Sequence, residues 1–78
     1  MNEIINRENP QKLYLQLEEI IKKKIEDKEW TVASKIPTEE ELCKIYGVSK
    51  APVRAAILEL VRQGYLMRQQ GKGTFVCK

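Results

Sequence analysis

The residues best suited to chemistry in this chain are two cations, Lys50 and Arg54, in the segment YGVSKAPVRAAILELVRQGYL, residues 46–66. Ser49 is a residue type that caps helices, so we predict that a helix begins there, with Lys50 in its first turn. The free N–H groups of a first turn carry partial positive charge, and a cation there loses about 0.3 to 1 kcal/mol relative to an anion. A polyanionic partner laid against this helix end would offset that loss.

Length and composition narrow the class of protein. The 78 residues predict one small domain, residues 1–78, with a thin core and no large catalytic cleft. The hydrophobic fraction of 42% and the charged fraction of 32% are typical of a globular chain. A net charge of +3 is compatible with an anionic partner without requiring one. No apolar run is long enough to span a bilayer, so we expect a cytoplasmic protein with no membrane partner.

The sequence contains no set of residues for catalysis or metal binding. It lacks histidine, and Cys43 and Cys77 form no C-x-x-C pair, so we expect neither a zinc site nor a cofactor. We expect both cysteines to be reduced structural thiols, and one disulfide is the alternative. No nucleophile has an assignable base and no glycine loop is of the kind that cradles phosphate, so we do not expect an enzyme.

Hydrophobic spacing predicts a first helix that starts at Pro10, with Asn9 as its cap. Glu18 and Lys22 are expected to form a solvated pair on its outer face. The acids on that face argue against the alternative of a basic amphipathic membrane helix. Trp30 should close the helix end onto the core. The predicted inner face of this helix consists of Leu13, Leu17, Ile20, Ile21 and Ile25.

A second helix is predicted to begin at a capping box formed by Thr38 and Glu41 and to stop at Gly47. Leu42 and Ile45 are expected on its buried face. Only two residues separate that glycine from the next helix, and such a tight connection is typical of a helix-turn-helix.

The third helix shows two different faces. Its inner stripe is predicted to consist of Val53, Ala56, Ile57 and Leu60. Its outward face is predicted to carry Lys50, Ala51, Arg54, Ala55 and Arg62. That face has basic side chains at its margins and small alanine side chains in its middle, so the helix backbone could approach a grooved partner closely.

A hairpin is predicted after the third helix, because the apolar period changes from about 3.6 to 2. Two short strands, residues 65–69 and 73–77, flank the turn QGKG, with Lys72 at its tip. A lone hairpin is marginal in water, so we expect it to pack on the helices through Leu66, Phe75 and Val76.

Three helices followed by a hairpin predict an α+β, mainly α fold, a three-helix winged helix-turn-helix with a C-terminal β-hairpin wing. In that arrangement the second helix of the helix-turn-helix enters the major groove of DNA with its N-terminal residues on base edges. Lys50 can then share a phosphate with the exposed N–H groups. Arg54 faces the same way and can make a bidentate contact with guanine.

The run from Ile36 to Val76 resembles the N-terminal domain of GntR-type bacterial transcription regulators. The family pattern reads roughly L-P-S-E-R-E-L-A, then G-V-S-R-x-T-V-R-x-A-L, then G-x-G-T-F-V, and this chain has IPTEEELC, GVSKAPVRAAI and GKGTFV at that spacing and in that order. The ending RQQGKGTFV is similar to the HutC-type branch. The resemblance implies sequence-specific binding of double-stranded DNA by a regulator such as a repressor, with the third helix in the major groove and the wing in the minor groove.

The resemblance also implies a homodimer in the full-length regulator and a palindromic operator, with a larger C-terminal effector and dimerisation domain that is not present in this chain. It assigns DNA contacts in the recognition helix to Ser49, Lys50, Ala51, Pro52 and Arg54. It assigns contacts at the wing tip to Gly71, Lys72 and Gly73. Further candidates for phosphate contacts are Thr38, Arg62 and Arg68.

The chain departs from the family pattern at two places. Glu40 stands where the family usually has an arginine used on phosphate, so that contact is not expected here. Ala51 and Pro52 stand at positions often held by threonine, which removes hydroxyl contacts and leaves apolar surface for thymine methyl groups.

The alternative function is a winged-helix protein–protein interaction module, in which the outward alanines and Leu58 would dock a partner. Leu58 falls near the outward stripe of the third helix, and it would otherwise pack beneath the wing. The three tyrosines lie in different predicted elements, so a base-stacking platform for single strands is not expected.

Overall fold

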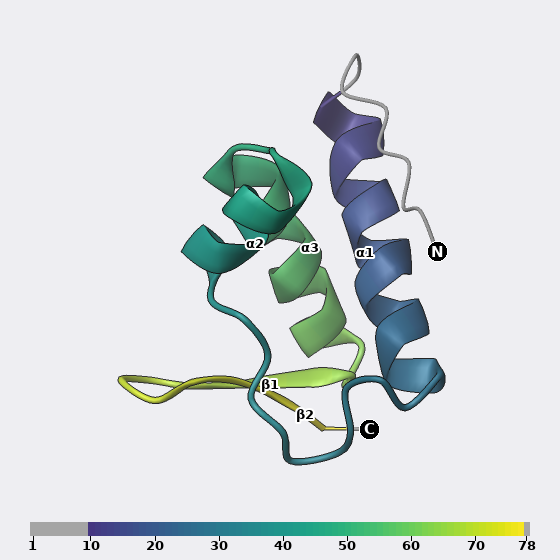
Figure 1. Ribbon diagram of the computed structural model, residues 1–78, viewed down its shortest axis with the longest axis vertical. Helices are drawn as coiled ribbons and strands as arrows, with labels where there is room; N and C mark the ends of the chain where they lie inside the picture. Colours follow the sequence, from purple (N-terminus) through teal and green to yellow (C-terminus); the bar gives the residue numbers. More distant parts are fainter. Residues whose placement is uncertain (1–9, 78) are drawn as a thin grey trace.

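The computed structural model describes residues 10–77. It contains three helices and one two-stranded antiparallel sheet, which confirms the predicted winged helix-turn-helix. In Figure 1, α3 lies between α1 and α2, and the hairpin runs below the helices and extends to one side as a wing. The elements are α1 (Pro10–Glu26), α2 (Glu39–Tyr46), α3 (Lys50–Arg62), β1 (Leu66–Gln69) and β2 (Gly73–Val76). The predicted cap Asn9 lies outside the described residues.

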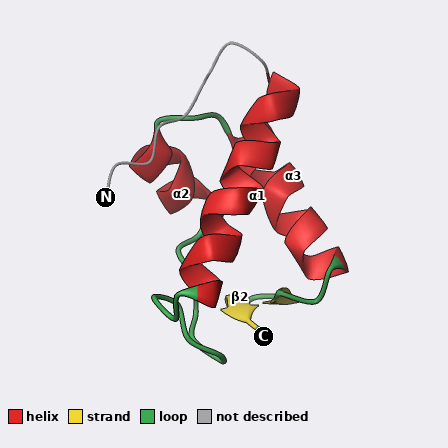
Figure 2. Ribbon diagram, turned by 90° about the vertical axis from the view of Figure 1, so that its right-hand side faces the viewer, coloured by secondary structure: helices red, strands yellow, loops and turns green. Residues whose placement is uncertain are grey.

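The core lies mainly between α1 and α3, and Figure 2 shows α1 in front of α3 with β2 below both helices. The predicted inner stripe of α3 is confirmed, because all four of its residues are buried. On α1 the prediction holds for four residues, while Ile20 is only partly buried against the core. Trp30 also packs on the core, as expected. The buried apolar residues of α1 are Leu13, Leu17, Ile21 and Ile25.

Two expectations about burial are wrong. Ile45 is 59% exposed, because the short α2 buries only Leu42 and Tyr46, which lie one turn apart on a single line. Glu18 is only 8% exposed, and its carboxylate accepts a hydrogen bond of 3.0 Å from the amide of Gln63. The end of α3 therefore covers Glu18, which is not a solvated surface residue.

The helix-turn-helix connection has the predicted turn but lacks one predicted contact. Gly47 adopts a left-handed conformation with φ of 66°, which a glycine reaches without the strain that a side chain would add. Ser49 occupies the N-cap position of α3, but its side chain makes no capping hydrogen bond. The expected hydroxyl cap is therefore absent from this helix, although the helix begins at Lys50 as predicted.

The hairpin packs on the helices through one face only. Leu66 pairs with Val76 in the strand register, and both are buried. Met67 pairs with Phe75, and these two side chains lie on the other face because side chains alternate along a strand. Met67 is 43% exposed and Phe75 only partly buried, so the expectation that Phe75 anchors the hairpin on the helices is wrong.

The segment before α2 adds a third backbone partner to the hairpin, which the sequence did not indicate. The amide of Ala33 donates to the carbonyl of Val76 at 2.8 Å, and the amide of Ile36 donates to Thr74 at 2.9 Å. An isolated antiparallel bridge joins Lys35 to Phe75. These bonds cover the outer edge of β2 and fix the start of α2 relative to the wing.

The capping box of α2 is present in full and leads to a stability prediction. The amide of Glu41 donates to Thr38 Oγ1 at 3.1 Å, and the amide of Thr38 donates to Glu41 Oε1 at 2.8 Å. The backbone bond from Thr38 is the main reason that the pKa of the Glu41 carboxyl is lowered. We expect Thr38→Ala to lower the free energy of unfolding by about 0.5 to 2 kcal/mol, measured by urea titration with circular dichroism. The control is Ser49→Ala, which removes no capping bond and should change it by less than about 0.5 kcal/mol.

Candidate nucleic-acid interface

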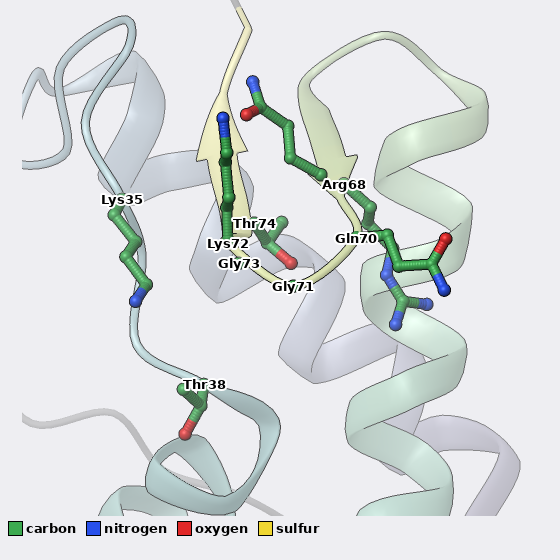
Figure 3. A pocket seen from close by; sticks show the side chains of 9 residues that line it. Lys35, Thr38, Arg68, Gln70, Gly71, Lys72, Gly73 and Thr74 are labelled. Carbon is green, nitrogen blue, oxygen red and sulfur yellow. The ribbon is translucent and has the colours of Figure 1, made fainter.

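A hollow of about 660 Å³, lined mainly by polar residues, lies between the wing and the start of α2. In Figure 3, Lys35 and Thr38 lie on one side of it and the turn of the hairpin on the other. A second hollow of about 250 Å³ continues toward α3 and adds Glu39, Glu40 and Lys50 to the lining. The larger hollow is lined by Lys35, Thr38, Arg68, Gln69, Gln70, Gly71, Lys72, Gly73 and Thr74.

The beginning of α3 presents most of its predicted contact residues to solvent. Ser49, Lys50, Ala51 and Arg54 are exposed. The exception is Pro52, which is buried and has little surface for a groove. Its expected role at thymine methyl groups stays a prediction, whereas Ala51 is accessible for such a contact.

Two acids at the start of α2 pair with the cations of α3. Glu40 lies 3.7 Å from the Nζ of Lys50, and both side chains are more than half exposed. Glu39 lies 3.3 Å from the Nη2 of Arg54. The cations of the first two turns of α3 are therefore each paired with an acid of the neighbouring helix, and such surface contacts are typically weak.

The wing tip is shaped by glycines and carries an exposed cation. Lys72 is exposed at the turn, and its amide donates to the carbonyl of Gln69 at 2.9 Å. Gly73 has a φ of 127°, and a Cβ there would lie 2.6 Å from the Cε of Lys35. Glycine at this position therefore adopts a backbone conformation that other residues rarely reach, and the Lys35 side chain lies beside it.

The structure separates the two arginines expected to contact phosphate. Arg68 lines both hollows and lies 3.9 Å from Glu39. Arg62 lies in the last turn of α3 and forms a close ion pair with Glu59. The hydrogen bonds from Arg62 and then from Gln63 lower the pKa of Glu59 to about 2. Arg68 is thus grouped with the recognition helix and the wing tip, whereas Arg62 is not.

Two charged residues of this surface were not identified from the sequence. Lys35 lies in a loop without helical or strand periodicity, and the backbone hydrogen bonds of this loop to β2 bring it to the wing. Glu39 is one of three acids in the first turn of α2. A favourable interaction with the helix dipole is sufficient to explain an acid at that position, so the sequence gives no reason to expect a further role. Its contact with Arg54, which is 15 residues away, has no signal in the sequence.

The surface brings together cations from four segments of the chain. Those that line the two hollows come from the loop before α2, the first turn of α3, strand β1 and the hairpin turn, and Arg54 of α3 lies beside them through its contact with Glu39. The cations are Lys35, Lys50, Arg54, Arg68 and Lys72. A concave basic surface beside an exposed helix end fits a phosphate backbone next to a groove.

The sequence of residues 13–76 matches the family described as "Bacterial regulatory proteins, gntR family". The uncharacterized HTH-type transcriptional regulator YurK of Bacillus subtilis (strain 168) is 51% identical over 73 residues, which cover 94% of this chain and 30% of that protein. The histidine utilization repressor of Pseudomonas putida is 35% identical over 71 residues, which cover 91% of this chain and 29% of that protein. This chain thus spans about 30% of the length of such relatives.

Solved structures include a close counterpart. The crystal structure of AraR(DBD) in complex with operator ORR3 superposes with a TM-score of 0.78 at 46% identity. The match covers 81% of this chain and 76% of that one. Within residues 10–77, no helix is long and apolar enough to cross a membrane.

Proposed function

Since this chain belongs to the gntR family of bacterial regulatory proteins, we propose that it binds double-stranded DNA sequence-specifically as the winged helix-turn-helix domain of a transcription regulator. The N-terminal half of α3 enters the major groove, and the wing lies over the adjacent minor groove. The observation that carries this proposal is the convergence of cations from four segments on one concave surface beside the start of α3.

Each contact residue has a role that follows from its chemistry. Arg54 reads a guanine through paired N–H donors, and Ala51 offers a methyl group to thymine. Lys50 and the first amides of α3 bind a phosphate, because Ser49 leaves that helix end without a side-chain cap. Lys72 reaches the minor groove from the wing tip, where Gly71 and Gly73 allow the backbone to come close.

The phosphates between the two grooves are proposed to lie along the hollow beneath the wing. Lys35 and Arg68 neutralise them from its two sides, and Thr38 lines the same surface. The match to AraR(DBD), whose structure contains operator DNA, supports DNA as the partner.

The relatives are about three times as long as this chain. In a whole regulator of that length, we propose that two such domains act as a homodimer on a palindromic operator. The relatives named as repressors support repression as the outcome. We propose a cytoplasmic protein that catalyses no reaction and uses no cofactor, as expected of a DNA-binding domain of this family.

Salt dependence tests the proposal. Duplexes are selected from a random pool with the 78-residue chain, and affinity is then measured between low and high salt. The logarithm of affinity should fall linearly with the logarithm of salt, with a slope of about 0.9 per phosphate neutralised. Lys72→Ala should weaken binding to all duplexes alike and reduce that slope by about 1.

The control for Lys72→Ala is Lys23→Ala, which removes the same charge from an exposed position on α1. Because α1 lies across α3 from α2 and away from the wing tip, this change should leave the slope nearly unaltered (Figure 1). Equal effects of the two variants would mean that the wing makes no phosphate contact. Absence of binding to any duplex at low salt would refute the proposal.

The rival function is a protein-interaction module, which the 47% exposure of Leu58 on α3 favours. Leu58 is not among the side chains packed against the core, so the expectation that it packs beneath the wing is not met. A protein partner would give a shallow salt dependence and a marked loss of binding on Leu58→Ala. DNA binding by the start of α3 predicts that Leu58→Ala leaves duplex affinity within about twofold of the original.

A further inference from the structure

Glu39, the first residue of α2, contacts arginines from two other elements. Its Oε1 accepts hydrogen bonds from the Nε of Arg54 at 3.4 Å and from the Nη2 at 3.3 Å. Its Oε2 lies 3.9 Å from the Nη2 of Arg68 on β1. The Glu39 side chain is only 17% exposed, whereas those of Arg54 and Arg68 are 59% and 47% exposed. One carboxylate, partly covered, thus joins the recognition helix to the wing.

From this geometry we infer that Glu39 is a positioning residue that determines which guanidinium edge of Arg54 faces the DNA. The inference rests on the proposed function and deepens it. It concerns base discrimination rather than affinity, because a negative charge beside a DNA-binding surface opposes phosphate binding.

The donor geometry of arginine explains how one acid can serve this role. A guanidinium carries five N–H donors in a rigid plane. Glu39 occupies the side edge formed by Nε and Nη2 of Arg54. The end of the fork, with both Nη1 donors and the second Nη2 donor, remains for the paired acceptors O6 and N7 of guanine. The carboxylate therefore restricts the side chain to conformers that present this end.

The energetic gain comes from preorganisation. A flexible arginine loses rotamer entropy when it is fixed against a base, and a contact that already restricts it in the free domain reduces that loss. The ion pair itself contributes little to stability, since Arg54 is largely exposed. The second contact, to Arg68, places β1 of the wing beside the same carboxylate. Glu39 therefore contacts both of the elements that are proposed to enter the grooves, α3 and the wing.

Glu40 supplies a matched comparison on the same turn. It carries the same charge one residue later, but it is 75% exposed and contacts Lys50 at 3.7 Å. Lysine is a point charge without a planar fork, so this pair restricts no donor pattern. Glu40 should therefore affect the electrostatics of binding without affecting base discrimination.

The experiment compares Glu39→Ala, Glu40→Ala and Arg54→Ala in the 78-residue chain. Two duplexes are used. One is the duplex selected by the original chain. The other differs from it at one base pair, the position where Arg54→Ala abolishes the preference for guanine. The measured quantity is the ratio of the two affinities. We expect Glu39→Ala to reduce this ratio by roughly 2- to 5-fold, which is the range that an exposed ion pair can supply and part of the discrimination that a bidentate contact provides.

Two further results are expected if Glu39 acts through Arg54. Glu40→Ala should raise affinity for both duplexes equally and leave the ratio unchanged. In the Arg54→Ala background, Glu39→Ala should not reduce the ratio further, since there is no guanidinium left to position. Urea unfolding of each variant identifies any loss that comes from a destabilised α2.

Several outcomes would overturn the inference. If Glu39→Ala raises affinity for both duplexes as Glu40→Ala does and keeps the ratio, Glu39 only repels phosphate. If Arg54→Ala changes no base preference, there is no base contact to position. Either result would leave the proposed function standing, because the original chain would still bind DNA. Failure of the original chain to bind any duplex would instead refute the proposed function.

Discussion

Arg54→Ala is expected to weaken binding to the selected duplex by about 1 to 3 kcal/mol and to abolish the base preference at one position of the site. Arg54 lies in the second turn of α3 on the exposed face, with its guanidinium held by Glu39 at 3.3 Å. A bidentate contact to guanine is lost as a unit, because alanine offers no donor. The measurement is a binding titration against the selected duplex and a set with single base-pair changes.

Arg62→Ala is the control for this prediction. It makes the same substitution on the same helix two turns later, where the side chain is paired with Glu59 of its own helix, whereas Arg54 contacts Glu39 in the lining of the second hollow. We expect a smaller loss that is equal for all duplexes. If both variants lost affinity equally on every duplex, Arg54 would be a phosphate contact and the base-reading role would be wrong.

Leu60→Ala is expected to lower the free energy of unfolding by about 2 to 5 kcal/mol. Leu60 has no exposed surface and belongs to the core that joins α1 to α3. Alanine would lose the transfer energy of the removed carbons and leave a cavity that tightly packed neighbours fill only in part. Because a domain of this size has only a few kcal/mol of stability, the variant should be largely unfolded at 37 °C. Urea or thermal denaturation followed by circular dichroism measures the effect.

Leu58→Ala tests whether burial is the cause. It removes the same atoms from the same helix two residues earlier, but at a position that is 47% exposed. The loss should stay below about 1 kcal/mol. Similar losses from the two variants would show that burial of Leu60 in the core is not the cause of the loss, because alanine is the better helix former at either position.

Local patterns in the sequence were a reliable guide where the interacting residues are neighbours. The capping box of Thr38 and Glu41, the helix end at Gly47 and the hairpin around Lys72 were all predicted and are all present. The inner stripe of α3 was also predicted, because a helix that packs on both α1 and α2 buries a broad face.

The errors occur where an expectation depended on the width or position of a contact between elements. Ile45 fits a helical stripe, but α2 is eight residues long and packs along one line only. The spacing of Glu18 and Lys22 is that of a charge pair on a helix surface, but Gln63, which is 45 residues away in the sequence, covers Glu18 and donates a hydrogen bond to it. Phe75 fits an alternating strand, and the register then places it on the outer face with Met67.

The sequence by itself determined the order of the helices and the wing, and it located the cations of the recognition helix at Lys50 and Arg54. Caps, turns and stripes depend on residues a few positions apart, so they are encoded locally. Only the tertiary structure decided that Glu39 touches both Arg54 and Arg68 and that Lys35 reaches the wing over Gly73. These side chains are brought together by the packing of α2 and the hairpin around α3, and no spacing along the chain specifies that contact.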